Sequence, residues 1–342
     1  MNISIFGLGY VGAVTAGCLT HRGHAIVGVD VSEQKVESLN QGQAPIIEPG
    51  LPELLKAARD QKRLRATASC SDALADTELS IICVGTPSAI SGALDLTFVR
   101  GLLKEIGGDL RRTRKKHVLV FRSTMLPGST QELVDEHLGD LEQSGQIQVY
   151  YYPEFLREST AVADFENPSL AVVGTRTGVR PPEELMKGLF GTEAAVVNWQ
   201  TAEMIKYACN AFHAVKITFA NEVGRLGKQL GIDSRAVMDL VCRDTKLNLS
   251  PYYMKPGNPF GGSCLPKDVR ALVHAARIRG VALPMTENLL LSNERHLQSL
   301  LSLILDSGAR EVVILGLSFK SNTDDLRESA MVEVAQTLVG RG

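Results

Sequence analysis

The sequence has 342 residues, 44% of them hydrophobic and 22% charged, a composition that is typical of globular proteins and excludes a disordered chain. Its 36 Lys and Arg residues against 38 Asp and Glu give a formal net charge of −2, which indicates neither a nucleic acid nor a membrane surface as a partner. No apolar run reaches the about 18 residues that a membrane span needs.

The six cysteines lie scattered along the chain without CxxC spacing, which argues against a disulfide scaffold or a zinc site and for a reducing compartment. Residues 1–6 lack the charged and apolar regions of a signal peptide and instead are typical of a first strand. We therefore expect a cytoplasmic protein without a bound metal.

Apolar strands and helical segments alternate over roughly the first 195 residues. The first strand, Ile3–Phe6, precedes a glycine-rich turn at 7–12 and a helical stretch that Gly23 can end, and a second strand covers Ala25–Asp30. Further apolar runs lie at 79–84, 117–122, 147–152 and 170–173. This alternation predicts an α/β fold whose N-terminal domain, residues 1–198, is a Rossmann-type, doubly wound parallel sheet.

The turn after the first strand carries Gly7, Gly9 and Gly12 in the spacing of the dinucleotide fingerprint. Gly7 permits the turn, Gly9 lets the backbone approach a pyrophosphate, and Gly12 lets the helix pack closely on the strand. Asp30 ends the second strand, where a carboxylate can bind ribose hydroxyls and would repel a 2′-phosphate. The pattern predicts NAD rather than NADP; the alternative is a glycine-rich turn without a ligand.

Three further polar loops follow predicted strands, at 85–88, 122–124 and 153–158. Ligands of open α/β sheets bind at the carboxyl ends of the strands. We therefore expect these loops to converge on one crevice with the glycine-rich turn.

The middle of the chain changes to a helical pattern, which predicts an all-helical central domain over residues 199–300. A long helix is expected from Thr201 to about Leu230. Gly231 breaks it, and Asp233 or Ser234 can cap a helix that runs to Cys242. A loop at 248–266, a helix from Lys267 and a helical pair to about residue 307 follow. The broad apolar face of the long helix contains Met204, Ala208, Ala211, Phe212, Val215, Phe219 and Val223.

The last residues look like the opening of a second Rossmann-like domain, residues 301–342. The run Glu311–Leu317 is strand-like and is followed by one more helix. A lone strand and helix of this kind cannot form their own core.

Cys264 is the strongest candidate for a reactive group. Pro266 suits the first turn of a helix, so Cys264 should lie at the helix amino terminus, where the helix end and Lys267 both favour a thiolate. Gly261 and Gly262 leave room for a substrate. The other cysteines lie in apolar elements, and we interpret Cys18, Cys83, Cys209 and Cys242, and less firmly Cys70, as small buried hydrophobic residues.

Lys206, Asn210 and His213 share one side of the long helix, because they lie four and three residues apart. A buried lysine needs an anionic partner or a catalytic duty, whereas a solvated face needs neither. The helix alone leaves both interpretations open.

Four motifs in chain order, with supporting residues near the end of the chain, resemble the nucleotide-sugar 6-dehydrogenases of the UDP-glucose/GDP-mannose dehydrogenase family. They are Gly-Leu-Gly-Tyr-Val-Gly at 7–12, Pro-Glu-Phe-Leu-Arg-Glu at 153–158, Glu-Met-Ile-Lys-Tyr at 203–207 and Gly-Gly-Ser-Cys-Leu-Pro-Lys-Asp at 261–268, with Phe-Lys at 319–320 and Asp-Leu-Arg-Glu-Ser at 325–329. The resemblance implies a four-electron oxidation of the C6 alcohol of a nucleotide sugar to a carboxylate, with two NAD⁺.

The family's residue roles transfer onto matching positions of this sequence. Cys264 would be the nucleophile in a thiohemiacetal and thioester sequence, Lys206 and Asn210 would stabilise oxyanions, and Asp268, with a water near Thr124 and Glu154, would move protons. Cofactor positions, besides the glycines, are Tyr10, Val11, Asp30, Lys35, Thr86, Thr124, Lys267 and Arg327. Substrate positions are Phe155, Leu156, Glu158, Lys206, Asn210, His213, Asn221, Tyr252, Tyr253, Lys255, Asn258, Gly261 and Lys320.

Within the family, the run Tyr-Tyr-Met-Lys-Pro-Gly at 252–257 is more similar to the GDP-mannose enzymes than to the UDP-glucose enzymes. Lys255 stands where the GDP-mannose enzymes commonly carry Arg, and Asn258 where they carry an apolar residue. The resemblance also implies a dimer or larger assembly through the long helix, with Lys255 of the partner subunit reaching the diphosphate, and a role in alginate or another uronate polysaccharide.

Other interpretations stay open at this point. A UDP-hexose substrate is one, a two-electron 3-hydroxyacid dehydrogenase without a use for Cys264 is another, and an inactive NAD-binding fragment is a third. The last follows because the family has a third domain of roughly a hundred residues, of which we expect this chain to hold only the start.

Overall fold

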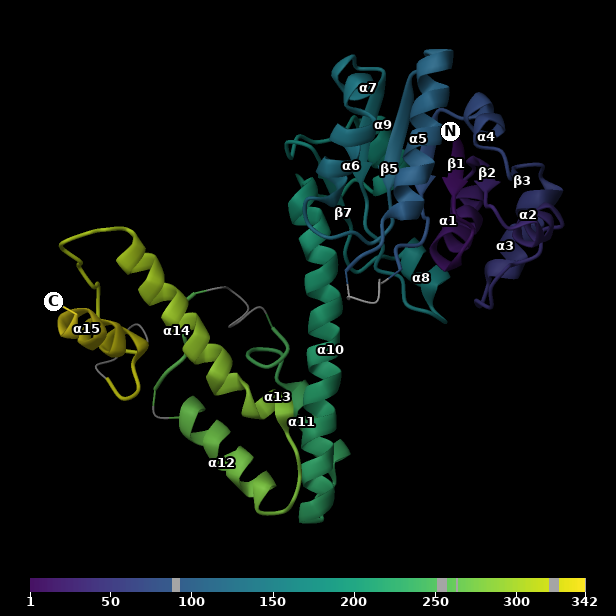
Figure 1. Cartoon of the computed structure of the whole chain (residues 1–342). Coiled ribbons are helices and arrows are strands. Elements are labelled where there is room, and N and C mark those ends of the chain that lie inside the picture. The colour runs from purple at the N-terminus through teal and green to yellow at the C-terminus, as the bar shows by residue number, and fades with distance from the viewer. Residues whose placement is uncertain (88–92, 251–256, 263, 320–325, 342) are drawn as a thin grey trace. The chain divides into compact units, whose positions relative to one another are not determined.

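Residues 1–210 are built around one sheet of eight strands (Figure 1). The computed structural model describes residues 1–87, 93–250, 257–262, 264–319 and 326–341, and divides into two compact units, Met1–Asn210 and Ala211–Gly342. The strands are β1 (Asn2–Phe6), β2 (Ala25–Val29), β3 (Leu64–Thr67), β4 (Leu79–Ile82), β5 (His117–Phe121), β6 (Ile147–Tyr151), β7 (Val172–Thr175) and β8 (Ala195–Asn198).

The strand order is β3-β2-β1-β4-β5-β6-β7-β8, and the described pairings are parallel except for β6 with β7. The predicted doubly wound sheet is thus confirmed, with one correction. Tyr151 of β6 lies opposite Gly174 of β7 in antiparallel orientation. The all-parallel expectation was wrong here because alternation of strands and helices does not exclude a strand that returns along its neighbour.

Helices cover both faces of this sheet, and alternate strand residues serve the two faces. Ile5 and Val120 are buried in a cluster with Val14 of one face, whereas Phe6 and Phe121 are buried in a second cluster on the other. The helical segments are α1 (Tyr10–His21), α2 (Glu33–Asn40), α3 (Leu51–Asp60), α4 (Cys70–Asp76), α5 (Thr97–Thr113), α6 (Ser129–His137), α7 (Gly139–Gln143), α8 (Ala161–Glu166), α9 (Glu183–Leu185) and the π-helical turn η1 (Met186–Phe190).

The second unit is helical in the part that the structure describes. The long helix α10 (Trp199–Leu230), whose residues up to Asn210 belong to the first unit, matches the expected one. Asp233 caps the next helix by accepting hydrogen bonds from the backbone N–H groups of Arg235 and Ala236, at 3.0 and 3.3 Å. The other helices are α11 (Ser234–Arg243), α12 (Leu265–Arg277), α13 (Pro284–Glu287), α14 (Leu289–Asp306) and α15 (Ala330–Gly340). None of the helices in the described ranges is long and apolar enough to span a bilayer.

The expected strand at Glu311–Leu317 is absent: these residues are described and lie outside any strand. A strand needs a neighbour to pair its backbone groups, and the described chain places none beside this segment. Residues 301–342 instead join the second unit through α15, where Ala330 and Val334 pack on Leu297 and Leu301 of α14.

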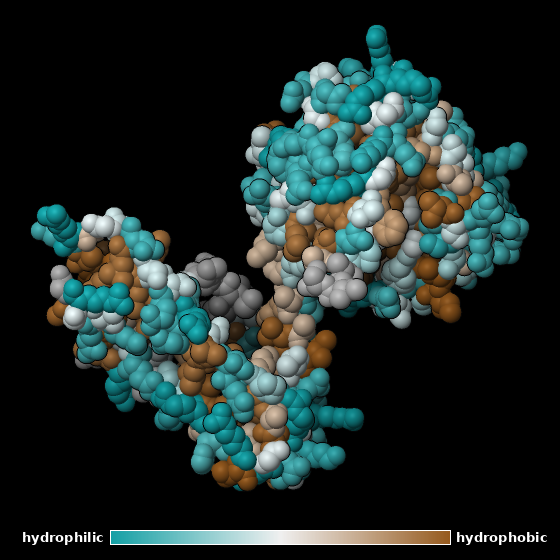
Figure 2. Space-filling model, in the orientation of Figure 1, coloured by the Kyte–Doolittle hydropathy of each residue, from teal (hydrophilic) through white to brown (hydrophobic). Residues whose placement is uncertain are grey.

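Several apolar side chains lie at the surface, which Figure 2 shows as brown areas. Six of the seven residues of the apolar face predicted on the long helix are exposed, namely Met204, Ala208, Ala211, Phe212, Val215 and Phe219. Cys242, which we expected to be buried, is also exposed, because α11 has no buried residue in the structure. Cys18 is buried as expected.

Candidate active site

The glycine-rich turn has the geometry that a dinucleotide site needs. Gly7 has a φ of +95°, and a Cβ there would lie 2.8 Å from the backbone of Cys83. A Cβ on Gly12 would lie 1.8 Å from the carbonyl oxygen of Gly7, so helix α1 can pack at this distance only with glycine. Nothing lies within 4 Å of the Cβ position of Gly9, so its backbone is open to a phosphate at the helix amino terminus.

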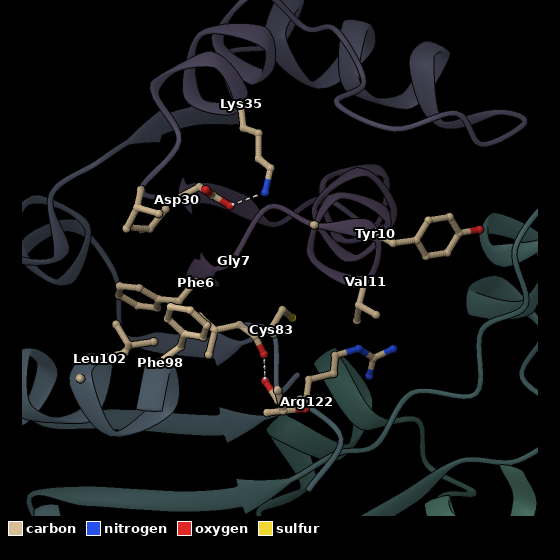
Figure 3. A pocket seen from close by; sticks show the side chains of 18 of the residues that line it. Phe6, Gly7, Tyr10, Val11, Asp30, Lys35, Cys83, Phe98, Leu102 and Arg122 are labelled. Carbon is tan, nitrogen blue, oxygen red and sulfur yellow. Dashed lines mark hydrogen bonds and ion pairs between the residues drawn. The ribbon is translucent and has the colours of Figure 1, made fainter. Parts of the chain in front are cut away.

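Asp30 lies at the end of β2 as a buried, charged group (Figure 3). Its carboxylate accepts hydrogen bonds from the backbone N–H groups of Leu8, at 2.7 Å, and Ser32, at 2.9 Å, and pairs with Lys35 Nζ at 3.2 Å. Burial alone would raise the pKa of Asp30, but these partners outweigh it and the pKa is lowered. The carboxylate is therefore ionised at neutral pH and can accept further hydrogen bonds from ribose hydroxyls.

A cavity of about 750 Å³ lies at the carboxyl ends of β1, β2, β4 and β5 (Figure 3). Its volume falls in the range of cofactor sites. The predicted residues that line it are Gly7, Gly9, Tyr10, Val11, Asp30, Lys35, Thr86, Thr124 and Glu154. The structure thus gathers the cofactor residues predicted within residues 1–210, except Gly12, around one cavity, and Thr86 Oγ1 donates to the carbonyl of Thr124 at 2.8 Å.

The cavity also has an apolar part that the sequence did not reveal. Val31, Phe98 and Leu102 line it, with Glu105 and Cys70 beside them. An apolar wall suits a flat base, a carboxylate suits a ribose, and helix N–H groups suit a pyrophosphate, so the described residues fit NAD. Phe98 and Leu102 stand in no motif, and only their spacing on one face of helix α5 could have indicated them.

Lys206 and Glu154 form a buried ion pair, so Lys206 is the buried lysine of the first interpretation, whereas Asn210 and His213 on the same side of the long helix are exposed. Lys206 Nζ lies 2.7 Å from Glu154 Oε1, and their side chains are 7% and 13% exposed. The other oxygen of Glu154 accepts from the backbone N–H of Leu156 at 2.7 Å, and the Lys206 ammonium lies 5.5 Å from the centre of the Phe155 ring. Glu154 lines the cavity, so a paired cation stands at its wall.

Glu203, one turn before Lys206, holds the amino terminus of α6 and was not predicted as a site residue. Its carboxylate accepts from the backbone N–H groups of Gly128, at 2.6 Å, and Thr130, at 2.7 Å, and from the Thr130 hydroxyl at 2.6 Å. It is fully buried, and burial outweighs these hydrogen bonds, so its pKa is raised. The sequence could have indicated this role, because a glutamate in a helix segment that packs on the sheet becomes buried, and a buried carboxylate needs hydrogen-bond donors.

Cys264 occupies the predicted position in the second unit. It is the N-cap residue of α12, it is exposed, and Pro266 lies in the first turn. Lys267 Nζ pairs with Asp268 Oδ1 at 2.8 Å, and this hydrogen bond raises the pKa of Lys267. The Lys267 ammonium is therefore paired with the carboxylate of the neighbouring Asp268.

The glycine pair before Cys264 has a packing role, whereas we expected it to leave room for a substrate. A Cβ on Gly261 would lie 2.1 Å from the carbonyl oxygen of Glu328, and a Cβ on Gly262, whose φ is +85°, would lie 2.8 Å from the Phe319 ring. The backbone of Phe260 exchanges two hydrogen bonds of 2.9 Å with the amide of Asn293. The segment leading to Cys264 is thus fixed on both sides.

Among the remaining predicted residues, the exposed ones are Glu158, Asn210, His213, Asn221, Asn258 and Arg327. Tyr252, Tyr253, Lys255 and Lys320 lie outside the described residues.

Comparisons with known proteins agree with this geometry. Residues 1–192 match the NAD-binding domain model, and residues 200–295 the central domain model, of the UDP-glucose/GDP-mannose dehydrogenase family. The whole chain is 48% identical to GDP-mannose 6-dehydrogenases of Pseudomonas putida and Pseudomonas aeruginosa, covering 79% of each, and 36% identical to a UDP-glucose 6-dehydrogenase of Haloferax volcanii, covering 81%. A crystal structure of a GDP-mannose dehydrogenase ternary complex from Pseudomonas aeruginosa superposes with a TM-score of 0.94 at 47% identity, over 100% of this chain and 79% of the other.

Proposed function

Because this chain belongs to the UDP-glucose/GDP-mannose dehydrogenase family, we propose that it oxidises the C6 alcohol of GDP-mannose to the carboxylate of GDP-mannuronate with two NAD⁺ per sugar. Membership makes it an NAD-dependent nucleotide-sugar dehydrogenase. The observation that carries the choice of GDP-mannose is the higher identity to the GDP-mannose enzymes than to the UDP-glucose enzymes. A UDP-hexose is the second candidate substrate.

The first unit supplies the cofactor site. Backbone N–H groups at the start of α1 would hold the pyrophosphate, and Asp30 would accept hydrogen bonds from the ribose hydroxyls. NAD⁺ supplies the hydride acceptor for each of the two oxidations.

Lys206 stabilises negative charge that develops on the substrate oxygen, and Glu154 accepts a proton from the substrate. An ammonium has three N–H donors, so Lys206 can hold Glu154 and also donate to an alkoxide or a thioester oxyanion. Glu154, whose other oxygen accepts from Leu156, takes a proton from the substrate alcohol directly or through a water near Thr124. Asn210 is the second oxyanion donor.

Cys264 makes the second oxidation possible. Its thiolate adds to the C6 aldehyde carbon, and the oxygen gains a proton, which gives a thiohemiacetal. Loss of the C6 hydride and of the hydroxyl proton then leaves a thioester. Water, with Asp268 accepting its proton, cleaves the C–S bond and returns the thiol and a carboxylate. An aldehyde alone offers no such easy second hydride, which is why a thiol serves this chemistry.

NADH stoichiometry tests this proposal. The chain is incubated with NAD⁺ and limiting GDP-mannose or UDP-glucose, and NADH is counted by absorbance. Two NADH per GDP-mannose are expected; one per sugar would indicate a two-electron dehydrogenase, and none with any sugar nucleotide would leave an NAD-binding protein. Cys264→Ser should abolish the second oxidation, whereas Cys242→Ser, at the other exposed cysteine of the second unit, should keep it. Two NADH from Cys264→Ser would exclude the thioester.

A further inference from the structure

Glu48 joins two segments of the first unit that lie far apart in the sequence. It precedes α3 and is only 3% exposed. Its carboxylate accepts a short hydrogen bond from the Tyr10 hydroxyl and further ones from the backbone N–H groups of Ser159, at 2.9 Å, and Ala161, at 2.8 Å. Figure 3 shows the ring of Tyr10 directed away from Asp30 and Lys35, so its hydroxyl is not turned toward the ribose site.

The segment that Glu48 holds carries Glu158. Ser159 has a φ of +73°, a left-handed conformation that costs a non-glycine residue about 1 kcal/mol or more and persists only where its surroundings impose it. On the other side of Glu158, Asp164 binds Arg157 through its backbone N–H at 3.0 Å and its guanidinium at 2.6 Å. The backbone on either side of Glu158 is therefore fixed, from Glu48 and from Asp164.

The link between Tyr10 and Glu48 is a strong one at neutral pH. Burial would raise the pKa of Glu48, but the hydrogen bonds from Tyr10, Ser159 and Ala161 lower it. The pKa of Tyr10 is raised by burial and by Glu48, so the phenol stays protonated. A phenol donating to a buried carboxylate is a charge-assisted hydrogen bond, which is shorter and stronger than a neutral one.

We propose that Glu48 is a positioning residue that couples the two ligand sites of the first unit. NAD bound at the backbone of Tyr10 fixes the first turn of α1, and the Tyr10 hydroxyl passes this order through Glu48 to residues 156–161. This segment carries Glu158, so cofactor binding prepares the substrate loop. The assignment of Glu158 to the sugar nucleotide rests on the proposed function; the link to NAD does not.

Hydrogen exchange of the full chain tests the link with NAD alone. Saturating NAD should slow exchange at the amides of Ser159 and Ala161 by about fivefold or more in the unchanged protein. In Tyr10→Phe, which keeps the ring and removes only the hydroxyl, NAD at the same saturation should change these rates less than about twofold. Glu48→Gln, which keeps the side-chain length, should behave like Tyr10→Phe.

A matched control is Arg22→Ala, because Arg22 joins the far end of α1 to α8 through Glu166, at 3.2 Å, and the carbonyl of Phe165, at 3.1 Å. This variant should keep the NAD-dependent protection. The proposal is overturned if NAD does not slow exchange at the amides of Ser159 and Ala161 in the unchanged protein. It is also overturned if NAD slows their exchange as much in Tyr10→Phe as in the unchanged protein.

A second measurement tests whether the binding of NAD is coupled to the binding of the substrate. The Kd of NAD is determined without and with GDP-mannose. The Kd without GDP-mannose divided by the Kd with it should exceed about five in the unchanged protein and in Arg22→Ala. In Tyr10→Phe this ratio should approach one. An equal ratio in all three overturns the coupling. If GDP-mannose binds none of them, the proposed function fails on its own, while the exchange experiment with NAD still decides the link.

Discussion

Two lysine–carboxylate pairs of nearly equal length, one in each unit, differ almost completely in their surroundings. Lys206 and Glu154 lie 2.7 Å apart with side chains 7% and 13% exposed, whereas Lys267 and Asp268 lie 2.8 Å apart and are both 67% exposed. Water screens the second pair and leaves the first nearly unscreened. Distance alone therefore says little about what an ion pair contributes.

The same contrast extends to the other candidate groups. In the first unit Asp30, Glu154 and Lys206 are buried and fixed by several partners, so the cofactor side of the site is preformed. In the second unit Cys264 and the pair beside it face solvent. We expect substitutions in the first group to affect folding and function together, and those in the second to affect chemistry alone.

The largest effect is expected from Lys206→Met. It leaves the Glu154 carboxylate buried without its cation, which should lower the free energy of unfolding by about 3–5 kcal/mol. The loss of an oxyanion donor should also reduce NADH production about 100-fold or more. Urea denaturation and initial rates measure both effects. Lys267→Met is the matched variant and should leave the denaturation midpoint unchanged; equal destabilisation of the two variants would show that solvent exposure does not set the difference.

Acid should weaken the first unit through His117. This histidine is buried, its Nε2 bonds the Ser80 hydroxyl at 2.7 Å, and burial lowers its pKa from 6.5 to about 4. The unfolded chain therefore binds the proton first as pH falls below 6.5, and stability is lost down to about pH 4, by about 2 kcal/mol between pH 7.5 and 5. In His117→Gln, urea titrations at both pH values should show a smaller loss of the free energy of unfolding, because the contribution of His117 is removed.

The exposed His296 of the second unit provides the comparison for that titration. His296→Gln should retain the full acid sensitivity of the unchanged protein. If it removed as much of the loss as His117→Gln does, burial of His117 would not be its cause.

Two buried glutamates of α10 test the contrast within one helix. Glu222 accepts from the backbone N–H groups of Met285, at 2.8 Å, and Thr286, at 3.0 Å, as Glu203 does at α6. The pKa of Glu222 is lowered, because these bonds and Arg225 outweigh burial, whereas that of Glu203 is raised. Charge removal should therefore cost more at Glu222→Gln, about 2 kcal/mol, than at Glu203→Gln.

Thermal or urea unfolding of both variants measures this difference, with Glu294→Gln as an exposed control on α14. The signs also predict opposite responses to pH. The Glu222 contribution is lost as pH falls through its lowered pKa, whereas the Glu203 carboxyl stabilises the fold increasingly as it becomes protonated. A greater loss in Glu203→Gln at neutral pH would contradict this.

The smallest effect concerns cofactor choice. Asp30→Asn removes the charge that repels a 2′-phosphate and frees Lys35 to bind it, so the Kd ratio of NADP to NAD should fall about tenfold, which is about 1.4 kcal/mol. Fluorescence titration with both dinucleotides measures it. Asp268→Asn, at the exposed carboxylate of the second unit, should leave the ratio unchanged, and a shift there would tie that residue to the ribose.

The parts of the structure that the sequence predicted depend on local patterns. The glycine spacing after β1, Pro266 after Cys264 and the cap at Asp233 each specify a geometry within a few residues. The expected helices and the cofactor cavity followed from these patterns. The assembly through the long helix and the roles assigned to Tyr252, Tyr253 and Lys255 remain predictions.

The parts that the sequence did not predict depend on distant partners. Glu48 meets Ser159 from 111 positions away, and no local pattern marks either of them. The apolar run at 311–317 has the composition of a strand, but pairing and not composition makes a strand. Lys206 shows the same limit, because its burial depends on Glu154 from a different element.

The antiparallel entry of β7 has a consequence for how this enzyme could diversify. A parallel neighbour would force residues 152–171 to cross back over the whole sheet before the next strand begins. β7 starts at the edge of the sheet where β6 ends. Residues 152–171, which include Glu154 and Glu158, can therefore stay at this edge and change in length there. Insertions at this edge could thus adapt the site to another sugar nucleotide while the hydrogen-bonded framework beneath keeps its register.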